Sequence, residues 1–78
     1  MGQRLYNNGM NSQQRIGKTL KKARKGLGLR QFDVAKKAEI SSNYYSMIER
    51  GEVESPGSQV MAKIAKLLKL KPSDVLPI

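Results

Sequence analysis

Residues 31–51 read QFDVAKKAEISSNYYSMIERG and contain two short helical patterns on either side of a tight turn. Apolar residues three or four positions apart in the first pattern predict a helix from Gln31 to Lys37. The residues Glu39-Ile40-Ser41 then interrupt the period and predict the turn. The side chains expected to point from this first helix into the core are Phe32, Ala35 and Ala38.

The second pattern predicts a helix from Ser42 to Glu49. Ser41 can cap its start by accepting a backbone N–H, and Gly51 tolerates the left-handed backbone that often ends a helix. Tyr45 and Ile48 lie one turn apart and are expected to face the core. The outer face then carries Ser42, Asn43, Ser46 and Met47. Such a pair of helices fits the major groove of DNA, although helical hairpins also occur in protein-interaction domains.

A longer helix is predicted before this pair. From Gln13, apolar residues recur at steps of four, three and four, until Gly26 and Gly28 end the pattern. The residues expected to face inward are Ile16, Leu20, Ala23 and Leu27. Six cations and no acid fall on this segment, which is typical of a solvated face.

Two further helices are predicted after the pair. Residues 52–57 predict a loop, and a helix then opens at Gly57 or Ser58. Its expected inward residues are Met61, Ile64, Ala65 and Leu68. A last short helix begins around Pro72, because proline suits a first helical turn. No two-residue alternation occurs, so we expect an all-α fold of about five short helices and no sheet.

The first residues show no apolar period and are rich in asparagine and glycine. We therefore expect residues 1–13 to form a flexible N-terminal arm and residues 14–78 to form the folded domain. The arm is either inert or a minor-groove contact carrying Arg4.

Composition excludes several function classes. The chain has 78 residues, no Cys, no His and no Trp, so it offers neither a disulfide framework nor a thiolate or imidazole metal site. We expect no enzyme activity, no cofactor and no bound metal. Fifteen Lys and Arg against six Asp and Glu give a net charge of +9, which favours a polyanionic partner. No apolar run approaches the roughly 20 residues that span a bilayer, so we expect a cytoplasmic protein without a membrane partner.

The residues quoted above resemble the Cro/Xre-type helix-turn-helix pattern of phage repressors. In that pattern a Gln opens the second helix, an Ala follows four residues later, and the recognition helix ends in Ile-Glu-Arg-Gly, as in Gln31, Ala35 and residues 48–51. The resemblance covers about residues 16–76. Its other matches are Ile16, Gly17, Leu20, Arg24, Pro56 and residues 63–66. It implies a lambda-repressor-like helix-turn-helix domain.

The resemblance also implies roles for single residues. The base-reading positions fall on Ser42, Asn43 and Met47. Among these, Asn43 can make a bidentate contact with adenine, and Met47 either contacts a thymine methyl group or fills the helix edge. The phosphate-contacting positions fall on Arg30, Gln31, Tyr44, Arg50 and Ser58. Arg24 and Glu49 are expected to form a mainly structural ion pair.

Some residues depart from the family pattern. Glu39 occupies a turn position where the family often has Gly, and Tyr45 replaces a small β-branched residue that faces the core. Glu52 and Glu54 make the next loop acidic where the family often carries basic residues, and Gly57 offers no side chain to the minor groove.

Two functions follow as hypotheses. The first is a transcriptional regulator, either a repressor or an autoregulator, that reads a palindromic operator in double-stranded DNA. It would act as a homodimer through its last helix, with contacts from Leu70, Val75, Leu76 and Ile78. The second is a protein-interaction module of the same fold, with weak or no DNA binding, whose partner is a toxin or another protein.

Overall fold

The computed structural model describes residues 11–75, which form four α-helices and one short 3-10 helix. The helices are α1 (Ser12–Gly26), α2 (Gln31–Ala38), α3 (Ser42–Glu49) and α4 (Ser58–Leu67), and the 3-10 helix is η1 (Pro72–Asp74). No strand occurs in this part of the chain. The prediction of an all-α fold is confirmed, and the expected fifth helix is a single 3-10 turn. No described helix is long and apolar enough to cross a membrane.

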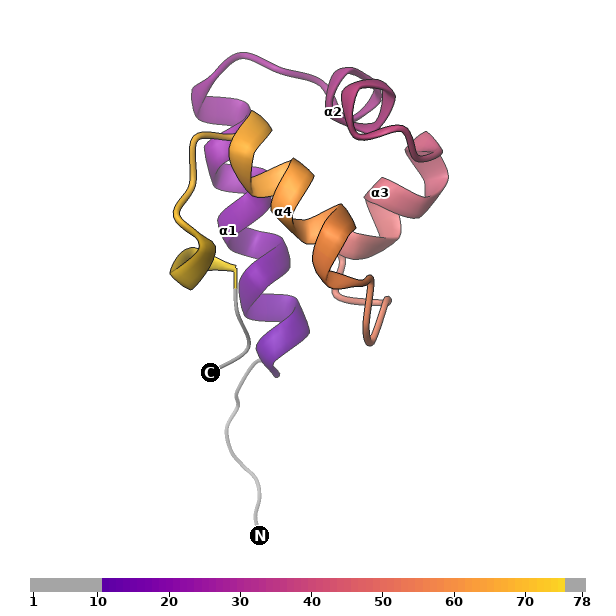
Figure 1. Cartoon of the computed structure of the whole chain (residues 1–78), viewed down its shortest axis with the longest axis vertical. Helices are drawn as coiled ribbons and strands as arrows, with labels where there is room; N and C mark the ends of the chain where they lie inside the picture. The colour runs from indigo at the N-terminus through magenta and orange to yellow at the C-terminus, as the bar shows by residue number, and fades with distance from the viewer. Residues whose placement is uncertain (1–10, 76–78) are drawn as a thin grey trace, which may run out of the picture.

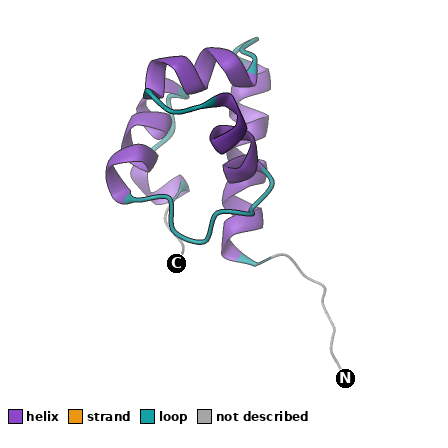
Figure 2. Ribbon diagram, turned by 90° about the vertical axis from the view of Figure 1, so that its right-hand side faces the viewer, coloured by secondary structure: helices purple, strands orange, loops and turns teal. Residues whose placement is uncertain are grey.

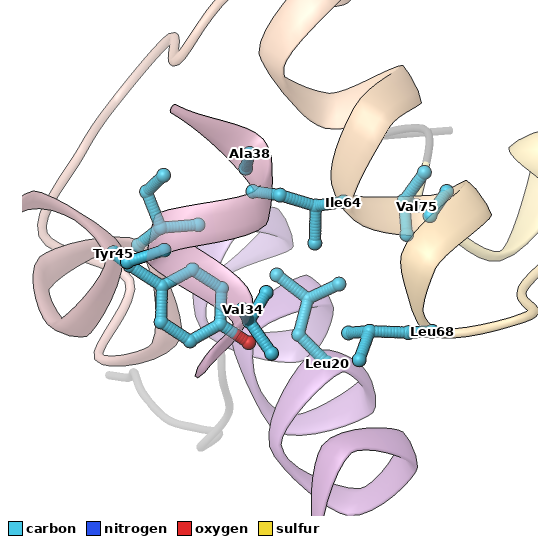
Figure 3. Close-up of a cluster of buried hydrophobic side chains, with 10 residues drawn as sticks. Leu20, Val34, Ala38, Tyr45, Ile64, Leu68 and Val75 are labelled. Atoms are coloured by element: carbon cyan, nitrogen blue, oxygen red, sulfur yellow. The ribbon is translucent and has the colours of Figure 1, made fainter. Parts of the chain in front are cut away.

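The helices surround one interior. α3 packs against both α1 and α2, and α2 packs against α4 (Figures 1 and 2). Every helix contributes side chains to the interior, among them Leu20, Val34, Ala38, Tyr45, Ile64 and Leu68 (Figure 3). α3 buries Tyr45 and Ile48 against its neighbouring helices, and its opposite face is therefore free for other contacts.

Local side-chain hydrogen bonds explain where the helices begin. Ser41 caps α3, since its Oγ accepts the backbone N–H of Tyr44 at 3.0 Å, and the predicted bounds of this helix are confirmed. Asn11 caps α1, and its side chain accepts the N–H of Gln14 at 2.8 Å. α1 therefore starts at Ser12, inside the segment expected to be an arm. Residues 1–10 of that arm, including Arg4, lie outside the described residues.

Two glycines allow α1 to lie directly on the end of α3. A Cβ atom on Gly17 would overlap the backbone carbonyl oxygen of Glu49, so only glycine permits this approach. Gly51 has a φ of 75°, and a Cβ there would lie 2.7 Å from the Gln14 side chain. The predicted left-handed residue after α3 is thus confirmed, and it also lies against α1.

The turn between α2 and α3 has a left-handed residue that is not glycine. Glu39, with φ 63° and ψ 40°, ends α2 at the turn position where the resembled family often has Gly. A side chain in this region costs some conformational energy. The carboxylate of Glu39 accepts a hydrogen bond from Lys63 of α4 at 2.9 Å, but both side chains are largely exposed. An exposed pair of this kind adds little stability.

Three expected positions are wrong. Leu27 follows the last residue of α1 and is 41% exposed, because the helix ends before the apolar period does. Phe32 is 58% exposed, since the buried stripe of α2 runs through Val34, Ala35 and Ala38. At 100° per residue, Phe32 lies roughly 110° from the centre of that stripe.

The third correction concerns the end of the chain. Val75, expected to contact a partner subunit, is only 5% exposed and belongs to the core beside Leu68 (Figure 3). The 3-10 turn η1 brings it back onto the domain instead of presenting it to a partner. Leu70 is partly buried against the same core. Leu76 and Ile78, the other two expected dimer contacts, lie outside the described residues.

Tyr45 is the largest fully buried side chain. Its ring fills the space between the helices, and its hydroxyl is buried without a hydrogen-bond partner among the described residues (Figure 3). Burial raises the pKa of the Tyr45 hydroxyl far above its ordinary value. The residue that departs from the family pattern in α3 is therefore the centre of this core.

Candidate nucleic-acid interface

The outer face of α3 carries polar side chains that the core does not use. Ser42 and Asn43 are exposed in the first turn, and Met47 is partly buried one turn after Asn43. The Asn43 amide nitrogen lies 3.9 Å from the Met47 sulfur, a weak contact that places the two side chains together. This arrangement presents a hydroxyl, an amide and a thioether over the first six residues of α3.

A buried ion pair joins α1 to the last residue of α3. Arg24 Nε donates to Glu49 Oε2 at 2.6 Å and Arg24 Nη2 donates to Oε1 at 3.1 Å, a bidentate geometry. The third guanidinium nitrogen donates to the carbonyl oxygen of Leu29 at 2.9 Å. The side chains of Arg24 and Glu49 are only 9% and 2% exposed. Removal of either partner would therefore leave the other with an uncompensated buried charge, which destabilises the fold.

The charge state of Glu49 is set by two opposing effects. Burial is the largest single effect and raises the pKa of the carboxyl, but the side-chain hydrogen bonds to Glu49, led by those from Arg24, and the positive charge of Arg24 together outweigh it and hold that pKa below its usual range. The hydrogen bonds with Glu49 raise the pKa of Arg24. The pair is therefore fully ionised at neutral pH.

Gln31 shares the carboxylate of this ion pair. Its Nε2 donates to Glu49 Oε1 at 3.0 Å from the first position of α2. An amide nitrogen carries two hydrogens, so this bond leaves one of them for another acceptor. Glu49 thus orients two side chains, Arg24 from α1 and Gln31 from α2, and fixes them relative to α3.

Two exposed arginines lie near the ends of the helix pair. Arg30 precedes α2, and its side chain is 83% exposed, with Nε 3.5 Å from the Asp33 carboxylate. Arg50 follows α3, and its Nε lies 2.8 Å from Glu52 Oε2. The hydrogen bond with Glu52 raises the pKa of Arg50, and Arg50 lowers the pKa of Glu52 in return.

The remaining candidate residues lie in the first turns of two helices. Tyr44 is partly buried in the first turn of α3, and Ser58 is exposed at the first position of α4. Gly57, which precedes Ser58, has no side chain to cap α4, so the first backbone N–H groups of this helix lack a side-chain acceptor.

Two contacts of the candidate residues were missed in the sequence analysis. Gln31 and Glu49 are 18 residues apart, and no periodic pattern connects them. Ser46 Oγ accepts a hydrogen bond from Arg50 Nη1 at 2.6 Å, which makes Ser46 part of the same surface. An i, i+4 spacing between Ser46 and Arg50 was the one available signal for the second contact. Within residues 11–75 no cluster of His, Cys, Asp or Glu could hold a metal ion.

A family model described as helix-turn-helix matches residues 20–75, which is more than half of the chain. The chain belongs to the helix-turn-helix family. The two helices of the motif are α2 and α3, which lie side by side in Figure 1 and pack against each other. All the candidate contact residues, from Arg24 to Ser58, fall inside the matched range.

The helix-turn-helix domain is also similar to a solved structure, that of the clp gene regulator ClgR from Corynebacterium glutamicum. The two share 25% sequence identity with a TM-score of 0.79, over 87% of this chain and 71% of that chain. A search for curated relatives gave no match. Family and fold are those of DNA-binding transcription regulators.

Proposed function

We propose that this helix-turn-helix protein binds operator DNA in a sequence-specific manner and acts as a repressor or autoregulator. The observation that carries the proposal is the outer face of α3. Its Ser42 and Asn43 are exposed and serve no packing role, while α1 and α2 hold the opposite face in the core. A short helix held in this way can enter the major groove with its first turn against the bases.

Base reading is assigned to the first turns of α3. Asn43 presents an amide that can pair with both N6 and N7 of adenine. Met47 lies beside it and offers a methyl group and sulfur to a thymine methyl. Ser42 can donate to or accept from either kind of base edge.

Phosphate contacts are assigned to residues that flank α3. The second amide hydrogen of Gln31 is available while Glu49 holds the first, so Gln31 can reach a phosphate oxygen without losing its support. Arg30 and Arg50 add exposed cations, and Tyr44 adds a hydroxyl donor. The backbone N–H groups at Ser58 complete the set, because a helix N-terminus attracts anions.

Binding as a homodimer to a palindromic site belongs to the same proposal. One domain of this size contacts too little DNA for tight specific binding, and a two-fold dimer doubles both the base and the phosphate contacts. Because Val75 is buried in its own domain, the contact between subunits would use the C-terminal segment around Leu70 without Val75.

One observation favours a second candidate function, a protein-interaction module. Phe32 is 58% exposed on α2, and a large aromatic side chain on the surface is typical of protein interfaces. In this alternative a protein partner, such as a toxin, covers Phe32, and DNA binding is weak or absent.

A salt titration distinguishes the two functions. A duplex is first selected from random sequences, and its affinity is measured over a range of salt concentrations. For about six phosphate contacts per dimer, the logarithm of affinity should fall linearly with the logarithm of salt, with a slope of about −5. A flat response would rule out backbone-anchored DNA binding and favour the protein partner.

Two variants sharpen this titration. Arg30→Gln removes a proposed phosphate contact and should reduce the slope by about one per half-site. Lys66→Gln removes the same charge from the last turn of α4 and serves as the matched control. Equal effects of the two variants would show that net charge, and not a contact at Arg30, sets the salt dependence.

A further inference from the structure

We propose that Glu52 competes with DNA phosphates for Arg50 and thereby sets how tightly the protein holds the DNA backbone. This inference rests on the proposed function and adds a residue that limits affinity. It concerns the acidic loop after α3, in a chain whose net charge is +9. Such a carboxylate at the edge of a DNA-binding face has no part in base reading or in the core.

The geometry of the pair is that of a phosphate contact. Arg50 Nε donates to Glu52 Oε2 at 2.8 Å, and Arg50 Nη2 donates to Oε1 at 3.2 Å. A guanidinium fork binds a carboxylate and a phosphate with the same two parallel hydrogen bonds. The third nitrogen, Nη1, donates to Ser46 Oγ at 2.6 Å. Glu52 therefore occupies the positions on Arg50 that two phosphate oxygens would take.

The backbone after α3 brings the two side chains together. Gly51 turns the chain with a φ of 75°, and the backbone N–H of Glu52 donates to the Met47 carbonyl oxygen at 2.9 Å. The turn itself lies against Gln14 of α1, which limits its movement. Because the partners are two residues apart in a defined turn, little chain entropy opposes the pairing.

The pair is weak enough to be displaced. The two side chains are 52% and 50% exposed, and an exposed ion pair changes an equilibrium by roughly 1.5- to 5-fold. A phosphate can therefore replace the carboxylate, although the displaced carboxylate then remains close and repels it. Competition for Arg50 and repulsion of the phosphate both lower the affinity for DNA. Neither effect depends on base sequence, because phosphates carry no base identity.

The test compares Glu52→Gln with Glu54→Gln on the selected duplex and on a scrambled duplex. Both variants remove one negative charge from the same exposed loop, but Glu54 forms no ion pair within residues 11–75. Glu52→Gln should tighten binding to both duplexes by about 2- to 5-fold per half-site. Its salt slope should become steeper by up to about 0.9 per half-site. Glu54→Gln should produce a clearly smaller change.

A second comparison uses the Arg50→Gln background. There the gain from Glu52→Gln should fall to that of Glu54→Gln, because the competed cation is gone. Equal gains from the two variants in the wild-type background, or a gain that persists without Arg50, would overturn the proposal in favour of a simple charge effect. If the wild-type protein bound no duplex at all, the proposed function itself would fail and this inference with it.

Discussion

Asn43 and Gln31 are two amide side chains on the same surface, and the structure holds them differently. Asn43 is exposed, and its amide nitrogen makes a weak contact with the Met47 sulfur at 3.9 Å. Gln31 is partly buried and is hydrogen-bonded at 3.0 Å to a carboxylate that is itself part of a buried ion pair. An unsupported amide can adapt to a base edge, whereas a supported amide can present one hydrogen in a defined direction.

This difference leads to a prediction for two alanine variants. Asn43→Ala should change the free energy of unfolding by no more than about 0.5 kcal/mol. It should lose about 1–3 kcal/mol of discrimination at one base pair in each half-site. Gln31→Ala should weaken binding to all sequences alike, because its partner is a phosphate. The measurement is a panel of single-base operator variants bound by both proteins.

The same panel identifies the reader if the assignment is wrong. A uniform loss of affinity with Asn43→Ala would mean that Asn43 contacts the backbone. Base discrimination would then have to come from Ser42 or Met47, and the panel repeated with alanine at those positions would show which.

At the scale of elements, the helix pair depends on one carboxylate. Glu49 ends α3 and accepts hydrogen bonds from α1 through Arg24 and from α2 through Gln31. Glu49→Ala should destabilise the protein by about 3–5 kcal/mol, because it leaves the Arg24 guanidinium buried without its partner. Thermal or chemical unfolding measures the loss, and Glu54→Ala in the exposed loop is the control.

The same carboxylate predicts how stability depends on acid. The pKa of Glu49 is lowered in the folded protein. Ionised Glu49 therefore makes its full contribution to the free energy of unfolding at pH values above the pKa of glutamate in the unfolded chain, about 4.3. Stability should decrease as the pH falls below that value towards the lower folded pKa, because the unfolded chain binds the proton first. Replacing the pair with Arg24→Met and Glu49→Leu should remove this dependence and recover part of the stability. For the preceding prediction, an unchanged melting temperature of Glu49→Ala would show that the ion pair between Arg24 and Glu49 does not stabilise the fold.

The elements also show which features a sequence can predict. The bounds of α3 follow from Ser41 and Gly51, which act through bonds and backbone angles within a few residues. α2 is different, because eight residues with several apolar side chains allow more than one buried stripe. The prediction that Phe32 faces inward is wrong and Val34 is buried instead, because packing against α3 and α4 decides which stripe faces the core.

The candidate site was predictable to a similar extent. The pairing of Arg24 with Glu49 came from family resemblance, since 25 residues separate them and no periodicity relates them. The bond from Gln31 to the same carboxylate was not foreseen, because it depends on how two helices are placed in space. Nor was the contact between Arg50 and Glu52, which requires the left-handed turn at Gly51 to be known in atomic detail.

For the whole molecule, the buried phenol of Tyr45 predicts instability in alkali. Its pKa is raised in the folded protein, while in the unfolded chain a tyrosine ionises near pH 10. The folded state keeps this proton and the unfolded state loses it. The neutral hydroxyl of Tyr45 therefore makes its full contribution to stability below about pH 10. Above that pH, the free energy of unfolding should fall by about 1.4 kcal/mol per pH unit.

Chemical unfolding at a series of alkaline pH values measures this slope. Tyr45→Phe keeps the ring, removes a buried hydroxyl that lacks a partner, and should make the slope shallower without loss of stability at neutral pH. Tyr44→Phe, in the partly buried neighbouring position, is the control. A slope that Tyr45→Phe leaves unchanged would show that other groups cause the alkaline instability.

The buried phenol also makes the protein its own optical probe. The chain has three tyrosines and no tryptophan, so tyrosine dominates its near-ultraviolet absorption. Ionised tyrosine absorbs at longer wavelength than neutral tyrosine, and Tyr45, with no exposed surface, can ionise only after water reaches the interior. After a rapid jump to alkaline pH, tyrosines that solvent already reaches will change absorbance at once, and the change from Tyr45 will lag behind. The delay between the two signals reports the rate at which the four helices separate, without any added dye.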